Sequence, residues 1–169
     1  MKTLTILFAA LLLAVAPARA TAQDIAAPTG PVVLTISGDL DVTNVDDTLQ
    51  FDYAALEELD DTVIVTSTPW TEGVHRFQGV SLHVLATRLN LSGGALVATA
   101  MNDYSIEIPI SDAIAGGPII AYALDGKAMT VRDKGPLWVI YPFDQSEEFR
   151  TEVVKSRSIW QLDRLTVID

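Results

Sequence analysis

The sequence contains no cysteine in its 169 residues. Disulfides, thiolate metal ligands and a cysteine nucleophile are therefore excluded, because each needs a sulfur that this side chain supplies. Histidine is scarce as well: the two residues, His75 and His83, are not at a metal-binding spacing. We therefore assign no catalytic and no metal-ligating residue from the sequence.

Basic residues are also few, with 11 Lys and Arg against 22 Asp and Glu and a formal net charge of −11. This sign argues against nucleic acid and against an anionic membrane as partners, because both are negatively charged. An acidic surface is typical of a soluble secreted protein. It also leaves open an interaction module whose acidic pairs, such as Asp60-Asp61 or Glu147-Glu148, meet a basic partner.

The N-terminus has the pattern of a signal peptide over residues 1–22. Lys2 supplies the positive charge, Leu4 to Val15 is a short apolar run, and small residues at Ala20 and Ala22 suit cleavage after Ala22. Without an arginine pair before the apolar run, the pattern predicts the general secretion route and a periplasmic location. Cleavage would remove Lys2 and Arg19 and no acidic residue, which takes the net charge from −11 to −13.

The remaining chain is predicted to be a flexible leader over residues 23–31 and a single domain over residues 32–169. No later apolar run is long enough to predict a membrane span after signal cleavage. Alternating or β-branched segments predict many short strands, and two segments with helical character predict two short helices. The predicted class is α+β, with a β-rich, mixed, partly barrel-like sheet.

The predicted helices cover residues 53–59, with Asp52 as N-cap, and residues 82–89, with Ser81 as N-cap. The predicted strands cover residues 32–37, 48–51, 62–67, 95–101, 104–110, 119–124, 137–141, 159–162 and 165–168. Trp138, Tyr141 and Trp160 lie in apolar strand segments, and we expect them in the core.

Five segments between about residues 62 and 167 resemble, in the same order, the sulfite-oxidase-type molybdopterin-binding domain family. The first, Phe77-Gln78-Gly79-Val80-Ser81-Leu82, resembles that family's F-x-G-V-x-L motif at the start of a helix. The other four are Ala100 to Tyr104, Ile120 to Lys127, Lys134 to Pro142 and Ser158 to Val167. The chain is most similar to short periplasmic members described as molybdopterin-dependent oxidoreductases. The resemblance implies a mixed, partly barrel-like sheet with a cofactor cleft.

One departure from the family decides the expected chemistry. Catalytic members bind molybdenum through a cysteine near the end of the strand before the F-x-G-V segment. Here that strand is Val63 to Thr68, which has no thiol, and a serine or threonine hydroxyl is a poor substitute because it is hard to deprotonate. The family's cofactor is inserted in the cytoplasm, whereas a chain on the general secretion route crosses the membrane unfolded. We therefore expect no bound cofactor. The family resemblance alone would allow a molybdopterin.

Three loops could supply ligand-binding residues, and each has a simpler interpretation. Basic side chains before Gly135 could bind an anion or form a solvated turn. The loop after Pro69 could line a pocket with a tryptophan, an imidazole and a guanidinium, or could lie at the surface. The Asn102-Asp103 segment could reach the cleft or simply make a turn. The candidate ligand-binding residues are Trp70, His75, Arg76, Asn102, Tyr104, Arg132 and Lys134.

Together these observations predict a secreted periplasmic domain of the molybdopterin-dependent oxidoreductase superfamily that lacks molybdenum chemistry. Such a domain would act as a small-anion-binding or accessory, sensory module. Its partner would be a small anionic ligand, or a periplasmic or membrane sensor protein. The alternative is an oxidoreductase that binds a molybdopterin without a cysteine ligand, so the sequence leaves enzyme activity open.

Overall fold

The computed structural model describes residues 25–169, and the predicted signal peptide lies outside the described residues. Residues 25–31 have no regular secondary structure. The backbone N–H groups of Thr29 and Gly30 donate to Asp52 Oδ2 at 3.0 and 2.6 Å, just before helix α1 (Tyr53–Leu59). The start of the described chain is thereby joined to the first helix. The flexibility predicted for residues 23–31 stays a prediction.

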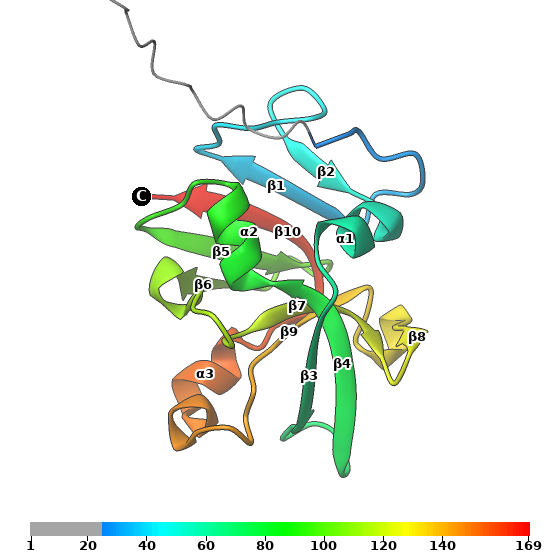
Figure 1. Ribbon diagram of the computed structural model, residues 1–169, viewed down its shortest axis with the longest axis vertical. Helices are drawn as coiled ribbons and strands as arrows, with labels where there is room; N and C mark the ends of the chain where they lie inside the picture. Colours follow the sequence, from blue (N-terminus) through cyan, green and yellow to red (C-terminus); the bar gives the residue numbers. More distant parts are fainter. Residues whose placement is uncertain (1–24) are drawn as a thin grey trace, which may run out of the picture.

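Ten strands within residues 25–169 form one mixed sheet with the order β2-β1-β10-β9-β7-β4-β3. Strands β5 and β6 branch from β10, β8 branches from β7, and β1 is parallel to β10 while the other pairs are antiparallel. The strands are β1 (Leu34–Gly38), β2 (Leu49–Phe51), β3 (Thr62–Ser67), β4 (Val74–Ser81), β5 (Ala95–Ala100), β6 (Ser105–Pro109), β7 (Ile119–Leu124), β8 (Lys127–Ala128), β9 (Leu137–Ile140) and β10 (Trp160–Ile168). The sheet curls into a half-barrel (Figure 1), which confirms the predicted class.

The sheet divides along β10, and this division positions the site described below. The first part of β10 pairs with β9 (Trp160 opposite Trp138), and the later part pairs with β5. The β10–β5 ladder shifts register between Leu162 and Arg164 and the β10–β9 ladder between Trp160 and Leu162, and Gln161 has a φ of 53°. β10 thus pairs with β9 at its start and with β1 and β5 further along, and its start lies where these neighbours separate.

Most predicted elements are confirmed by the structure. The strands 62–67 and 119–124 and the helix 53–59 have the predicted bounds, and Asp52 caps α1 by accepting from the Ala55 N–H at 2.8 Å. Helix α2 (Leu82–Arg88) also forms as predicted, but the Ser81 side chain does not cap it. The Ser81 backbone N–H donates to Asp60 Oδ2 instead, at 2.7 Å.

Three elements differ from the prediction. The segments 159–162 and 165–168 form one bulged strand, β10, and residues 74–81 form the long strand β4 where a loop was expected. Helix α3 (Glu152–Arg157) was not predicted. Strand β4 was missed because Val74 and Arg76 are exposed while Gly79 has no side chain. A Cβ on Gly79 would lie 2.2 Å from the Ile120 carbonyl oxygen, so the glycine permits close pairing with β7.

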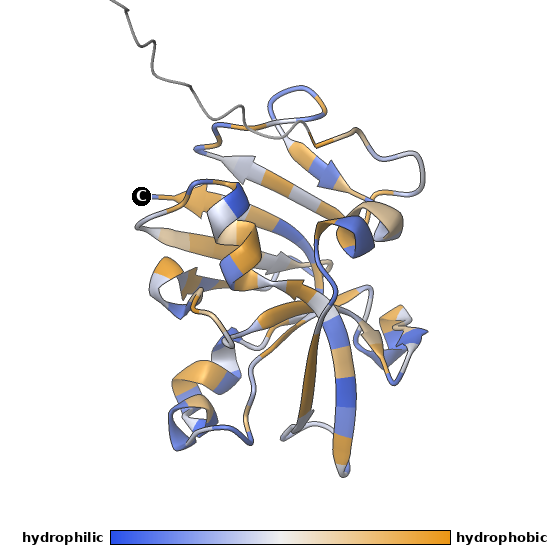
Figure 2. Ribbon diagram, viewed as in Figure 1, coloured by the Kyte–Doolittle hydropathy of each residue, from blue (hydrophilic) through white to orange (hydrophobic). Residues whose placement is uncertain are grey.

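The buried side chains form two clusters. The larger one is mostly aliphatic and fills the space between the curled sheet and helices α1 and α2. The smaller one lies between β3, β4, β7 and β9 and consists of Ile64, Phe77, Ile119, Ala121, Met129, Trp138 and Ile140. Trp70 packs against both clusters. Figure 2 shows hydrophobic and hydrophilic residues interspersed along β4, of which Phe77 is buried whereas Val74 is 62% exposed.

Candidate functional site

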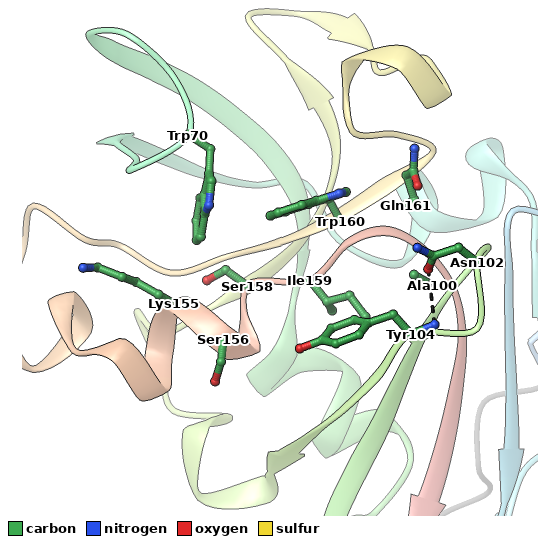
Figure 3. A pocket seen from close by; sticks show the side chains of 10 residues that line it. All are labelled: Trp70, Ala100, Asn102, Tyr104, Lys155, Ser156, Ser158, Ile159, Trp160 and Gln161. Atoms are coloured by element: carbon green, nitrogen blue, oxygen red, sulfur yellow. Dashed lines mark hydrogen bonds between the residues drawn. The ribbon is translucent and has the colours of Figure 1, made fainter.

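A pocket of about 280 Å³ lies where β10 begins, between four segments that are distant in sequence. The β3–β4 loop supplies Trp70, the β5–β6 turn supplies Asn102 and Tyr104, and α3 supplies Lys155. The start of β10 supplies the floor. The full lining is Trp70, Ala100, Asn102, Tyr104, Lys155, Ser156, Ser158, Ile159, Trp160 and Gln161 (Figure 3).

Tryptophan rings form the apolar wall of this pocket. The ring of Trp70 meets that of Trp160 edge-on, with 5.7 Å between centroids, and meets Trp138 at 5.9 Å. Trp138 is fully buried and its indole N–H donates to the Ser158 carbonyl at 3.1 Å. Trp160, in contrast, is 40% exposed, so the expectation that it belongs to the core is wrong, whereas Trp138 and Tyr141 are core residues as expected. The register of β10 turns Trp160 toward the pocket.

The β5–β6 turn presents polar groups beside these rings. Asn102 Oδ1 accepts from the Tyr104 N–H at 3.2 Å, and Asp103 has a φ of 65°. Arg164 holds the turn by donating to the Ala100 carbonyl at 3.0 Å and to Asp103 Oδ1 at 2.7 Å. Within residues 25–169, the Asn102 amide nitrogen and the Tyr104 hydroxyl have no hydrogen-bond partner, so both are available to a ligand. Asn102-Asp103 is therefore both a turn and a pocket rim.

Lys155 is the cation that lines this pocket. Its ammonium group donates to Glu152 at 2.7 Å within α3, and its side chain is 32% exposed against 88% for Glu152. An exposed pair of this kind contributes little and exchanges readily, because water screens it. In Figure 3 Lys155 lies below Trp70, and its ammonium group points away from Trp160 and Tyr104. Sequence reasoning missed it because the helix that carries it has no apolar periodicity strong enough to predict.

The structure separates the other predicted residues from the pocket. His75 and Arg76 lie on β4, where His75 Nδ1 is 2.7 Å from Asp125 Oδ2 and Arg76 Nη1 donates to Gln78 Oε1 at 2.7 Å. Arg132 is exposed in a 3₁₀ turn (Val131–Asp133). None of these three side chains lines the pocket that contains Trp70, and His75 and Arg76, as consecutive residues of β4, point to opposite faces of the sheet.

Lys134 takes an intermediate position. Its ammonium group lies 5.5 Å from the centre of the Trp138 ring, a cation–π arrangement, and it does not line the pocket. Its carbonyl accepts from the Gln161 N–H at 2.9 Å, and the Gln161 side chain donates to the Val131 carbonyl at 2.9 Å. The loop with Arg132 and Lys134 therefore supports the pocket floor through backbone contacts.

Several titratable groups have pKa values moved by their surroundings, and these groups lie outside the pocket. Asp125 and the Glu72 carbonyl raise the pKa of His75, and backbone and His75 hydrogen bonds lower the pKa of Asp125. Burial, together with a hydrogen bond to Asp61, raises the pKa of Tyr122 to about 12. These contacts stabilise the β4–β7 region, and none of these three groups lines the tryptophan pocket.

The donor set does not fit a molybdenum centre of the kind the resembled family uses. The sequence has no cysteine, and within residues 25–169 no three His, Asp or Glu side chains gather as metal ligands. The hydroxyls of Ser67 and Thr68 at the end of β3 are already engaged, with Asp144 at 2.7 Å and with Thr71 at 2.8 Å. No reaction step is therefore derived through such a group.

Comparison with known proteins defines the fold. No family model and no curated protein sequence matches the chain. Among solved structures, the sulfane dehydrogenase SoxCD from Paracoccus pantotrophus is similar, with a TM-score of 0.58 and 17% identity over 80% of this chain. The chain spans 38% of that dehydrogenase chain. The described residues thus have the β-rich, half-barrel fold of part of an oxidoreductase chain.

Proposed function

We propose that this protein is a ligand-binding domain that holds a small, flat organic anion against Trp70 and Trp160 and does no molybdenum chemistry. The observation that carries the proposal is the charge of the pocket lining. No carboxylate lines this pocket in the described part of the chain, and Lys155 supplies a positive charge. In a protein with 22 acidic and 11 basic residues, such a lining is unexpected without a ligand that needs it.

Two other hollows of the surface contain more carboxylates than cations. The one beside the N-terminal segment is lined by Asp52 and Glu58 with Arg88, and the one near the C-terminus by Asp39, Asp41 and Asp169. The second would repel an anion. A third hollow, at the end of β3, shares Lys155 with the tryptophan pocket and is also lined by Arg150 and Asp144. The tryptophan pocket combines apolar walls with a few polar groups at its rim, which is the usual composition of a small-molecule site.

The chemistry of the ligand follows from the donors. The amide of Asn102, the hydroxyl of Tyr104 and the ammonium of Lys155 all donate hydrogen bonds. Their natural acceptor is a carboxylate or sulfonate, and the tryptophan faces suit a planar apolar body. The ligand therefore combines a flat apolar portion with one acidic group.

A matched pair of probes tests this proposal by calorimetry: 2-naphthoate and its neutral amide, 2-naphthamide. We expect 2-naphthoate to bind more tightly, and the Lys155→Met variant to lose about tenfold in affinity for 2-naphthoate alone, since a charged hydrogen bond contributes about 1.5–3 kcal/mol. The control is Lys127→Met on β8, which removes the same charge far from the pocket. Equal binding of the two probes, or equal loss in both variants, would contradict an anion site.

Metal analysis tests the absence of molybdenum chemistry separately. Protein purified from the periplasm of cells grown with molybdate is expected to contain no stoichiometric molybdenum. About one molybdenum per chain would instead support the alternative, an oxidoreductase that binds a molybdopterin without a cysteine ligand.

We also propose that the chain is exported by the general secretion route and serves a periplasmic or membrane sensor protein as an accessory domain. Its support is the signal-like pattern of residues 1–22 together with a ligand pocket that, in the described part of the chain, is lined by no carboxylate and no histidine. No helix within residues 25–169 is long and apolar enough to cross a membrane. Fractionation, with N-terminal sequencing of the mature chain, tests the export: the expected first residue is Gln23.

A further inference from the structure

Strand β3 is an edge of the sheet whose outer backbone groups point into solvent. The Arg76 N–H donates to Asp125 Oδ1 and its carbonyl accepts from the Asp125 N–H, so the backbone of Arg76 faces away from β3. Val65 is the partner of Arg76 in the antiparallel register, so its own N–H and C=O face outward. The same holds for Val63, two residues earlier. Within residues 25–169, no strand pairs with that side of β3.

The side chains on this edge are apolar and uncharged. Val63 and Val65 are 38% and 62% exposed, and Val74 at the far end of β4 is 62% exposed. Natural proteins protect edge strands with charges, proline, bulges or shortness. The β3–β4 register contains no bulge, and Thr62 to Ser67 contains no charge and no proline.

The other edges of the described sheet carry such protection. Strand β6 contains Glu107 and Pro109, β8 has two residues including Lys127, and β2 has three residues. Strand β3 has six residues and is fixed from behind, because Ile64 and Thr66 are 5% and 1% exposed. Strand β3 is therefore a well-packed edge strand that, unlike β2, β6 and β8, has nothing in its sequence or length that would prevent another strand from pairing with it.

Charges flank the open portion. Asp61 precedes the strand, and its carboxylate accepts from the Tyr122 hydroxyl at 3.1 Å. At the other end Asp144 Oδ2 accepts from the outward Ser67 N–H at 2.6 Å and closes the edge there, with Arg150 3.9 Å away. Arg76 lies one strand further in, on β4. The open edge thus runs from Asp61 to Val65, with acidic side chains at both limits.

We propose that β3 docks an extended segment of a partner protein, which adds as a further strand and carries apolar residues at alternate positions with a basic residue facing Asp61. In such strand addition, the outward N–H and C=O groups of β3 hydrogen-bond to the partner's backbone and supply the affinity. The exposed Val63 and Val65 contact the partner's side chains and supply the specificity. A second copy of this chain is disfavoured, because its net charge of −11 would oppose that of the first. The inference does not depend on what the tryptophan pocket binds.

The test uses a synthetic seven-residue peptide of alternating valine and threonine with lysine at each end. We expect it to bind at up to millimolar concentration, to protect the Val63 and Val65 amides from hydrogen exchange, and to bind at least tenfold more tightly than a version with glutamate ends. N-methylation of the peptide amides that face β3 should abolish binding, whereas N-methylation of the alternate amides should not.

The matched variant is Val65→Pro, which removes one outward N–H at an edge position where proline is tolerated. We expect at least a tenfold loss of peptide affinity with an unchanged near-UV circular dichroism spectrum. The proposal is overturned if no peptide binds, if N-methylation makes no difference, or if the glutamate peptide binds equally well. A dimer in light scattering that Val65→Pro dissociates would also overturn it, because the occupant would then be a second copy.

Discussion

The two buried clusters differ in residue composition and in the surfaces that they border. The larger cluster is mostly aliphatic and draws residues from all three α-helices and from every strand except β3 and β8. The smaller cluster, with Phe77 and Trp138, borders the tryptophan pocket on one side and the open edge of β3 on the other. Both clusters stabilise the protein, and the smaller one also borders the two proposed recognition surfaces.

The largest effect is expected from Trp138→Ala. Trp138 is fully buried and touches the rings of Trp70, Phe77 and Trp160. Its removal should lower the free energy of unfolding by about 3–5 kcal/mol, measured by urea denaturation, and should abolish binding of 2-naphthoate. A loss below about 1 kcal/mol would mean that the smaller cluster is not a true core.

Leu96→Ala makes the corresponding test of the larger cluster. Leu96 is fully buried in the larger cluster on β5. We expect a loss of about 2–5 kcal/mol in the free energy of unfolding, with the affinity for 2-naphthoate unchanged under conditions where the variant is folded. A large change in affinity would contradict the claim that binding of 2-naphthoate depends on the smaller cluster.

Trp70→Ala should have the opposite result, a large loss of ligand affinity with a small loss of stability. Trp70 is half-buried and reaches the pocket from the tip of the β3–β4 hairpin. We expect at least a tenfold loss in affinity for both 2-naphthoate and 2-naphthamide, because the apolar wall serves both, with a cost of about 1 kcal/mol in stability. Unchanged binding in calorimetry would remove Trp70 from the site.

The smallest expected effect is a pH dependence of stability that arises from His75 on the β3–β4 hairpin, which also carries Trp70. His75 donates from both ring nitrogens when protonated, to Asp125 at 2.7 Å and to the Glu72 carbonyl at 2.8 Å, and these contacts raise its pKa. The stabilisation is therefore present in full below about pH 6.5 and is lost as the pH rises through the raised pKa of His75. It is also lost in acid, as the pH falls through the lowered pKa of Asp125.

The measurement is the difference in Tm between the wild type and His75→Gln across this range. The wild type should be more stable near pH 5.5, and the difference should shrink toward alkaline pH. A difference that grows above pH 7 would contradict the assigned contacts.

The fold followed largely from local patterns. The alternation in Thr62 to Ser67 and the apolar run at Ile119 to Leu124 report burial directly, so the bounds of β3 and β7 were predictable. Strand β4 was not, because its outer half alternates only weakly and Gly79 interrupts the pattern. Helix α3 was not, because one residue of its six, Val154, is buried.

The site was only partly predictable. Trp70, Asn102 and Tyr104 stood out through residue type and the family resemblance, and the structure brings them together. Trp160 did not, because its exposure depends on which strands pair with β10, which is a long-range feature. Lys155 did not, because helix α3, which carries it, has a single buried residue. The basic residues Arg76 and Arg132 do not line this pocket, since the charge of a residue does not indicate where its side chain points.

The most direct test of the central claim is to map 2-naphthoate onto the protein by NMR titration of backbone and indole resonances. The account predicts the largest shifts at Trp70, Tyr104, Lys155 and Trp160, with His75, Arg76 and Arg132 unaffected. Shifts centred on Arg132 and His75, with Tyr104 and Lys155 unchanged, would contradict it.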